Sequence, residues 1–298
     1  MFLQEYSEKW VDVSGIRTRY FEAGIGRPLV LVHGGTKGDS SGGANAEDFD
    51  RNFAQLAKKF RVIAVDRLGQ GYTDNPRCDE DWTMAASVRH FAGFLDALGY
   101  APYNLVGHSR GAYVVARVTL DHPRLVESCV MIDSSTASPS PGRSQILFSL
   151  NPYKPGTVEA SRWTYETYSC TTDHVTDGWI AMKQKITETK KNKEAIAKMK
   201  DEGLLATRFL PELLEDKEEF FMRLEKDGMR RPMLLFWGYN DPTAPLDCGL
   251  ELYDLIAKRQ PRTSLHIVNQ AGHHSFRERA AEFNRVIAEF VEGVVHGH

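Results

Sequence analysis

Cysteine is scarce in this sequence, and neither a long apolar run nor a strong excess of one charge is present. The four cysteines among 298 residues are Cys78, Cys129, Cys170 and Cys248, and they form no CxxC pair and no Cys/His metal-binding spacing. We therefore expect reduced thiols and no metal site. The net charge is only −3, so electrostatics give no reason to expect nucleic acid or an anionic membrane as a partner.

The N-terminal stretch MFLQEYSEKWVDVSG carries Glu5, Glu8 and Lys9 and has no apolar segment of the kind that a signal peptide requires. No apolar run approaches the roughly 20 residues that span a bilayer. We therefore expect a cytoplasmic protein without a membrane segment. Hydrophobic residues make up 42% of the chain, which is enough for a large core without disulfide or metal support.

Short apolar segments alternate with amphipathic ones over most of the chain. The pattern predicts a hairpin over residues 9–13 and 16–23, and buried strands over residues 28–35, 61–66, 103–109, 129–135, 232–238 and 263–269. Helices are predicted over residues 46–60, about 81–98, about 110–121, near 247–258 and near 276–292. This alternation is typical of an α/β protein with a mostly parallel, doubly wound sheet.

Residues 137–230 interrupt the alternation. They contain several prolines, the charged stretch TETKKNKEAIAKMKDEG and no apolar run of the buried-strand type. We interpret them as amphipathic helices whose charged faces lie in solvent. The predicted organisation is therefore an α/β core formed by residues 1–136 and 231–298, with a helical insertion at 137–230.

The stretch GHSRG, residues 107–111, fits the pattern G-x-S-x-G. The pattern alone is weak, but here the apolar run YNLVG precedes it and the predicted helix AYVVARVTL follows. A nucleophile elbow requires this strand, tight turn and helix, because the turn lifts the serine hydroxyl above the sheet. We therefore predict that Ser109 is a nucleophile; a serine that caps a helix in a tight turn is the alternative.

A serine nucleophile needs a base and a carboxylate that orients the base. Asp241 follows the predicted strand at 232–238, and His273 follows the strand at 263–269, so both come at strand ends where catalytic groups gather. The order Ser109, Asp241, His273 is the order expected for a triad on this type of sheet. Asp133 is a rival acid, and His274 competes with His273.

Two backbone N–H groups are expected to stabilise the oxyanion. One belongs to Arg110, which follows the nucleophile. The other is predicted in the loop after LVLVHGG, where Gly34, Gly35 and Thr36 are candidates and Gly35 is preferred. The loop lacks the spacing of a P-loop and of a GxGxxG fingerprint, so no nucleotide is expected.

The segments HGG, DRLGQGYTD, GHSRGA, FWGYNDPTAP and AGHH lie in the order and spacing of the α/β-hydrolase superfamily, which this chain resembles over about 10–136 and 231–292. Dehalogenases and epoxide hydrolases in this superfamily use an aspartate nucleophile, and Ser109 argues against them. The chain is most similar to the meta-cleavage product hydrolases, through PLDCGLELYDLI, AAEFNRVIAEF and SRWTYET. The resemblance implies an α/β-hydrolase fold with a helical cap, no cofactor, and a homodimer as an assembly to consider.

In that family a cap arginine binds the substrate carboxylate, and Arg162 in SRWTYET stands at the matching position. An arginine on a solvated helix is the alternative. The chain departs from the family pattern at His108, where asparagine is usual, at Arg110, where methionine is usual, and at His274, where tryptophan often stands. The resemblance places His108 and His274 among the residues that contact the substrate.

Together these features predict a cofactor-free serine hydrolase that acts on a small molecule. The resemblance implies cleavage of a carbon–carbon bond next to a ketone, in a carboxylate-bearing 2-hydroxy-6-oxo-dienoate or a β-diketone-like compound from aromatic ring degradation. An ester or lactone hydrolase with the same triad is the first alternative. A non-catalytic small-molecule binding protein on the same fold is the second.

Overall fold

The computed structural model describes residues 6–40 and 43–296 of the chain. Eight strands form one sheet in the order β1-β2-β4-β3-β5-β6-β7-β8. Their bounds are β1 Ser7–Val13, β2 Ile16–Ala23, β3 Pro28–Val32, β4 Arg61–Val65, β5 Tyr103–His108, β6 Val126–Ile132, β7 Met233–Gly238 and β8 Thr263–Val268. The hairpin strand β1 pairs antiparallel with β2, and β2 with β4, while every later pairing is parallel. The predicted α/β class with a mostly parallel sheet is therefore confirmed.

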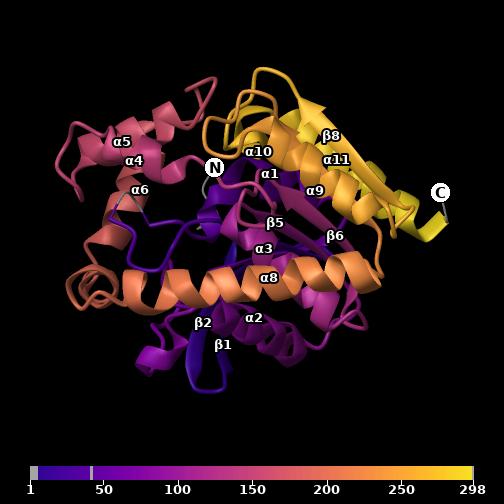
Figure 1. Cartoon of the computed structure of the whole chain (residues 1–298), viewed down its shortest axis with the longest axis horizontal. Helices are drawn as coiled ribbons and strands as arrows, with labels where there is room; N and C mark the ends of the chain where they lie inside the picture. The colour runs from indigo at the N-terminus through magenta and orange to yellow at the C-terminus, as the bar shows by residue number, and fades with distance from the viewer. Residues whose placement is uncertain (1–5, 41–42, 297–298) are drawn as a thin grey trace.

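Helices cover both faces of the sheet (Figure 1). Those of the α/β part are α1 Asp50–Leu56, α2 Met84–Leu98, α3 Arg110–Asp121, α9 Leu246–Ala257, α10 Ser275–Glu278 and α11 Ala280–His296. Two predicted helices differ from the bounds that the sequence pattern indicated. The helix expected over residues 46–60 begins as a 3-10 turn, Ala46–Phe49, and ends at Leu56, while the final helix is divided into α10 and α11.

The core lies in two layers because successive strand residues point to opposite faces. In β3, Val30 and Val32 pack against the cluster that includes α2 and α3, whereas Leu29 and Leu31 pack against the cluster that includes α1 and α11. All four side chains are completely buried. This explains why the parallel strands read as continuous apolar runs in the sequence.

The chain between β6 and β7 is helical. It contains α4 Ser144–Ser149, α5 Val158–Thr167, α6 Asp177–Thr187, α7 Lys190–Ile196 and α8 Leu210–Asp227, together with two short π-helical turns at Ala197–Asp201 and Leu205–Phe209. In Figure 1, α4, α5 and α6 lie together to one side of the sheet, while the long α8 crosses in front of α3.

Helix α8 packs on the α/β part of the molecule. Its Phe220 and Leu224 belong to the same buried cluster as α2 and α3, and Arg117 of α3 forms an ion pair of 2.5 Å with Asp216 of α8. Tyr113 of α3 also donates a hydrogen bond to Asp216, at 2.7 Å. The segment between β6 and β7 is thus anchored through α8 to the helices that cover one face of the sheet. Among the described helices, none has the length and hydropathy needed to cross a membrane.

Candidate active site

Ser109 lies at the sharp turn between β5 and α3. Its backbone dihedrals are φ 53° and ψ −122°, a conformation that costs a non-glycine residue about 1–3 kcal/mol. Its amide donates to the carbonyl of Ile132 at 2.8 Å, and the Ser134 hydroxyl donates to the Ser109 carbonyl at 2.6 Å. These contacts with β6 and the residues after it hold the strained turn.

The two glycines of GHSRG are required by close packing at this turn. A Cβ on Gly107 would lie 2.4 Å from the carbonyl oxygen of Gly111, and a Cβ on Gly111 would lie 2.4 Å from the carbonyl oxygens of Val32 and His33. Real Cβ atoms do not approach backbone atoms so closely. The glycines therefore allow α3 to begin directly against β3, which brings Ser109 beside the loop that follows β3.

His273 and Asp241 lie at the ends of β8 and β7 and form a buried pair. The Nδ1–H of His273 donates to Oδ2 of Asp241 at 2.7 Å. The other carboxylate oxygen accepts hydrogen bonds from the amides of Thr243 and Ala244, at 2.7 and 2.9 Å, and from the Thr243 hydroxyl at 2.9 Å. Four donors therefore fix the Asp241 carboxylate, and the bond to Nδ1 leaves Nε2 of His273 as the free acceptor of the ring.

The rival acid Asp133 does not contact His273. It accepts hydrogen bonds from the amide of Gly238 at 2.7 Å and from the hydroxyl of Ser275 at 2.5 Å, which links β6, β7 and the start of α10. Burial, followed by the nearby charge of Asp241, raises the pKa of Asp133 well above its ordinary value. Of the two candidate acids, the structure joins only Asp241 to the histidine.

The loop that carries His273 is held from two directions. Nε2–H of His108 donates to the His273 carbonyl at 2.7 Å, and the amide of His273 donates to the carbonyl of Tyr168, just after α5, at 2.8 Å. The Tyr168 ring also stands edge-on to the His273 ring, with centroids 5.4 Å apart. Burial, followed by the charge of His273, lowers the pKa of His108 well below its usual value, so this ring is neutral. The position of His273 thus depends on a side chain before the nucleophile and on the backbone of the inserted segment.

Ser109, His108, His273 and His274 line one cavity of about 380 Å³. No hydrogen bond of the Ser109 hydroxyl occurs among the residues that the structure describes. Such contacts are often long in enzymes without substrate and tighten in the Michaelis complex. The inserted helical segment also contributes to the lining of this cavity, through Phe148 of α4, Tyr168 and Leu213 of α8.

Gly35 faces Ser109 across the same cavity, in the loop after β3. The carbonyl of Gly34 accepts hydrogen bonds from Nδ1 of His33 at 2.9 Å and from Gln70 at 3.2 Å. Because the peptide group is planar and trans, the N–H of Gly35 points away from those two donors. Arg67 fixes the next peptide by donating to the Gly35 carbonyl at 2.8 Å. Within residues 6–40 and 43–296, no backbone hydrogen bond is donated by Gly35 or by Arg110, so both N–H groups are available.

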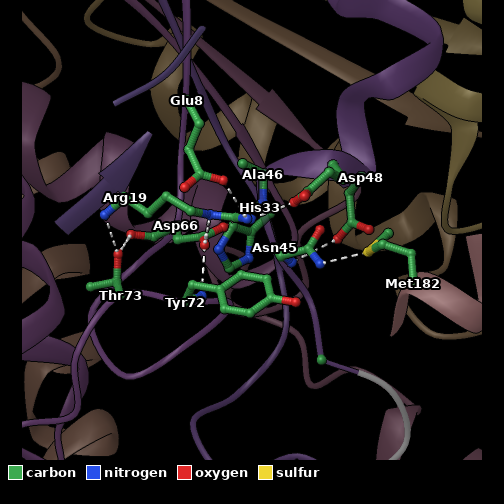
Figure 2. A network of polar contacts seen from close by, with 12 residues as sticks. Glu8, Arg19, His33, Asn45, Ala46, Asp48, Asp66, Tyr72, Thr73 and Met182 are labelled. Atoms are coloured by element: carbon green, nitrogen blue, oxygen red, sulfur yellow. Dashed lines mark hydrogen bonds and ion pairs between the residues drawn. The ribbon is translucent and has the colours of Figure 1, made fainter. Parts of the chain in front are cut away.

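A buried ionic network supports this loop from the edge of the sheet (Figure 2). Arg19 of β2 forms ion pairs with Asp66, at 2.7 Å, and Glu47, at 2.5 Å, and Asp66 also accepts the amide of Ala46 at 2.8 Å. Figure 2 shows the network continuing through Asn45, whose amide group contacts the sulfur of Met182 on α6 at 3.0 Å. The loop between β3 and α1 is therefore tied both to the sheet and to the inserted helices.

His274 lines the cavity and is surrounded by aromatic rings. Its ring is 5.2 Å from that of His108, 5.5 Å from that of Tyr165 and 6.1 Å from that of Trp179. Burial, followed by the charges of neighbouring histidines, lowers its pKa well below the usual value. Its Nδ1 is buried without a hydrogen-bond partner among the described residues. His274 does not contact Asp241, so the acid–histidine pair is formed by His273.

Arg162, on α5, is not brought to this site. Its guanidinium donates to the carbonyl of Val175 at 3.2 Å and forms ion pairs with Asp177 and Glu166. Among the residues that the structure describes, those that line the cavity beside Ser109 do not include Arg162. The geometry therefore agrees with the alternative, an arginine engaged on the outer part of the helical segment, and the carboxylate contact expected of Arg162 finds no support.

Several residues that shape the site were not singled out from the sequence. Asp48 on the first turn after the loop pairs with Lys183 of α6, and Tyr168 supports His273. Arg67 and Gln70 lie within DRLGQGYTD, which was used only for family resemblance. Among the described residues, no group of three or more His, Cys, Asp or Glu side chains is arranged to hold a metal ion.

Similarity to known proteins agrees with this geometry. The family described as alpha/beta hydrolase fold matches residues 27–280. The chain is 37% identical over 132 residues to a 2-hydroxy-6-oxo-6-(2'-aminophenyl)hexa-2,4-dienoic acid hydrolase from Metapseudomonas resinovorans, a match that covers 44% of this chain and 43% of that protein. It is 28% identical over 294 residues to a 2-hydroxy-6-oxononadienedioate/2-hydroxy-6-oxononatrienedioate hydrolase from Burkholderia vietnamiensis, covering 94% and 92% of the two chains.

The fold is also shared with solved structures. One is the 2-hydroxy-6-oxo-6-phenylhexa-2,4-dienoate hydrolase from Rhodococcus sp. strain RHA1, with a TM-score of 0.76, 18% sequence identity and coverage of 96% of this chain and 99% of that one. The parallel sheet, the serine at the strand-to-helix turn and the match over residues 27–280 lead to one assignment. The chain belongs to the α/β-hydrolase fold family, and its relatives include the meta-cleavage product hydrolases.

Proposed function

We propose that this protein is a serine hydrolase that cleaves a carbon–carbon bond next to a ketone. Its substrate is a carboxylate-bearing 2-hydroxy-6-oxo-dienoate or a β-diketone-like acid. The observation that carries the proposal is the buried His273–Asp241 pair, which lies in the cavity of Ser109 and leaves Nε2 of His273 free to accept a proton. The substrate class is supported by the relatives, whose names specify dienoate hydrolases.

In the first half of the reaction, Nε2 of His273 takes the hydroxyl proton of Ser109 as its oxygen attacks the ketone carbon. The Asp241 carboxylate stabilises the imidazolium that forms. The N–H groups of Gly35 and Arg110 donate to the oxyanion, and removing one such donor costs about 100- to 1,000-fold in kcat. The carbon–carbon bond then breaks, and its electron pair leaves as an enolate-type carbanion.

In the second half, His273 returns the proton to the leaving fragment, which departs with the substrate carboxylate and leaves an acyl-serine ester. Water, deprotonated by His273, attacks this ester and releases the carboxylic acid. The carbanion leaves readily only if a conjugated carbonyl group delocalises its charge. A 2-hydroxy-dienoate must therefore first move its enol proton to C5 and so present a ketone at C2. This requirement explains why a vinylogous or β-ketone is needed for carbon–carbon cleavage, whereas a simple ester is not.

The test uses the purified full chain with 2-hydroxy-6-oxo-6-phenylhexa-2,4-dienoate, with benzoate measured by mass spectrometry. We expect benzoate from the wild type and a loss of at least about 10⁴-fold in Ser109→Ala, in line with the effect of removing a nucleophile. A neutral activated ester is assayed in parallel. Turnover of the ester without benzoate would replace carbon–carbon cleavage by the ester hydrolase alternative. No turnover of either compound would contradict the proposal and favour a binding protein.

A further inference from the structure

The side chain of Arg110 lies between two cavities. The first is the cavity beside Ser109, and the second, of about 320 Å³, lies toward α4, α5 and the π-helical turns. The two share the lining residues Asp39, Arg110, Gln145 and Phe148. Arg110, which directly follows Ser109, therefore lies at the boundary between the two spaces.

Arg110 is partly buried, and its guanidinium lacks the partners that a covered arginine normally has. Within the described ranges, it takes part in no hydrogen bond and no ion pair, and its Nε is fully covered without a partner. The Cζ atom of Arg110 lies over the ring of Phe209, 5.5 Å from the ring centre. Buried charges in proteins are usually paired, because an unpaired one loses hydration without compensation. The position is thus suited to a negatively charged partner that arrives with a ligand.

The charges around the two cavities favour an anion. Among the described residues that line them, the carboxylates are Asp39 and Asp48, and Asp48 is already paired with the buried Lys183. The basic residues that line them besides Arg110 are Lys217 at the first cavity and Lys37 and Lys200 at the second. Positive charge therefore exceeds negative charge around this space.

Lys37 lines the second cavity, but its amino group is buried. It donates to the carbonyl of Thr83 at 2.8 Å and to the hydroxyl of Ser87 at 2.6 Å, both neutral acceptors. Burial lowers the pKa of Lys37 well below its ordinary value, so Lys37 adds little to the positive charge of the cavity. Burial also lowers the pKa of Arg110, and the charge of Asp39 opposes this effect. An incoming carboxylate would share Arg110 with Asp39 and would further favour the charged guanidinium.

We propose that Arg110 binds the carboxylate of the substrate and that the second cavity holds the acidic half of the molecule, with the acyl half in the cavity beside Ser109. This inference rests on the proposed function for the identity of the acid. A planar guanidinium binds a carboxylate through two parallel hydrogen bonds. In a 2-hydroxy-6-oxo-dienoate the ketone carbon C6 and the carboxyl carbon C1 are at opposite ends of a short chain. In the proposed arrangement, the backbone N–H of Arg110 is at the oxyanion and its guanidinium is at the acid.

The experiment compares the acid 2-hydroxy-6-oxo-6-phenylhexa-2,4-dienoate with its methyl ester, which differs only in charge. Benzoate formation reports carbon–carbon cleavage for both. In Arg110→Met we expect the ratio of kcat/KM for the acid to that for the ester to fall by about 10- to 100-fold, the range of a hydrogen bond to a charged group. Arg110→Lys keeps the charge but not the fork and should retain an intermediate ratio.

Two further variants locate the effect. Arg208→Met removes an arginine next to Phe209, where Arg208 pairs with Glu212 at 2.9 Å, and should leave the ratio unchanged. Lys217→Met removes the basic residue of the first cavity. A ratio that falls in Lys217→Met but stays at the wild-type value in Arg110→Met would overturn the proposal, because it would place the acid on the other side of Ser109.

Binding without turnover separates this inference from the proposed function. The dissociation constant of the same acid is measured on Ser109→Ala and on the double variant Ser109→Ala/Arg110→Met. We expect a weakening of about 10- to 100-fold in the double variant and little change for the methyl ester. If the wild type forms no benzoate, the proposed function fails, yet the binding comparison still decides the role of Arg110. Equal affinity of the two variants for the acid would refute that role.

Discussion

Nε2–H of His108 donates a hydrogen bond to the backbone carbonyl of His273, at 2.7 Å, so the residue before the nucleophile supports the loop of the proposed base. His108 is in this respect a positioning residue. The contact joins the end of β5 to the loop after β8, which are otherwise separated in the sheet by β6 and β7. A change at residue 108 should therefore act through the placement of His273.

Replacing His108 by leucine removes this support. We expect kcat for benzoate formation to fall about 10- to 100-fold, with KM nearly unchanged, since misplacement of a catalytic group affects the transition state. His108→Gln can still place a donor near the Nε2 position and should recover most of kcat. Steady-state kinetics on the three proteins check this prediction. Equal losses in the leucine and glutamine variants would contradict the positioning role.

The roles of Asp241 and Asp133 can be distinguished by replacing each of them with asparagine. Asp241→Asn should lower kcat by about 10⁴-fold with little loss of stability, because the amide cannot hold the required tautomer of His273. Asp133→Asn disturbs the contacts with Gly238 and Ser275 and should lower the free energy of unfolding by about 1–3 kcal/mol, while kcat changes less than about tenfold. Urea unfolding and benzoate formation measure the two effects. A larger loss of kcat in Asp133→Asn would reverse the assignment.

Gly35 can be tested against a glycine with a similar backbone. Gly35 has φ +78° and a Cβ there would lie 2.6 Å from Cβ of Ala44, whereas Gly156 has φ +86° with nothing within 4 Å. Gly156→Ala should cost about 1 kcal/mol of stability and no activity. Gly35→Ala should lose about 100-fold or more in kcat as well, because the loop must shift and carry its N–H away from the oxyanion. Retained kcat in Gly35→Ala would remove this residue from the oxyanion hole.

The buried histidine cage should make the protein sensitive to acid. The pKa of His274 is held well below its ordinary value of 6.5 by burial first, so below about pH 6.5 the unfolded chain binds a proton that the folded chain does not. Stability therefore falls as the pH falls through this range, by at most about 1.4 kcal/mol per pH unit for one group.

His274→Leu removes that group. As the pH is lowered from 7 to 5, the variant should lose less unfolding free energy than the wild type, so its relative stability should increase. Glu47, whose pKa burial raises to about 7, contributes with the opposite sign, but it is common to both proteins and cancels in the difference. Chemical denaturation at several pH values measures this. A difference that does not change with pH would show that folding leaves the pKa of His274 unshifted and would contradict the prediction.

Lys183 on α6 and Asp48 beside the cavity form a buried ion pair between the inserted segment and the rest of the chain. Lys183→Met leaves the Asp48 charge unpaired and should cost about 3–5 kcal/mol of stability. The double variant Lys183→Met/Asp48→Leu should recover most of this loss, because it removes both charges. Thermal and urea unfolding of the three proteins test the pair. A double variant as unstable as the single one would indicate that packing at α6, rather than charge, is responsible.

The sequence was sufficient to predict the sheet and the meeting of Ser109, Asp241 and His273 at one edge of it, because parallel strands place their C-terminal ends together. It favoured Asp241 through the order of the three residues but left Asp133 as a rival acid, since both follow neighbouring strands. That choice needed the hydrogen bond to Nδ1 of His273.

The residues around the substrate space were harder to predict. Arg162 was selected by its position in a family pattern, yet its guanidinium is occupied by Val175, Glu166 and Asp177. Such pairing depends on how α5 packs on the start of α6, which has no periodic signal in the sequence. The exposure of Arg110 to two cavities likewise depends on the insertion, whose helices have no fixed register against the sheet.

The amide of His273 donates to the carbonyl of Tyr168, and the amides of Cys170 and Thr171 donate to Glu278 of α10 at 2.9 and 2.7 Å. Backbone hydrogen bonds therefore join the inserted segment to the loop of the proposed base. If this segment were exchanged for the corresponding segment of a relative, the lining of the cavity would change. The carbonyl that accepts the hydrogen bond of the His273 amide would be replaced at the same time. Chimaeras that keep residues 168–171 of this chain should hence keep their turnover while their substrate range changes.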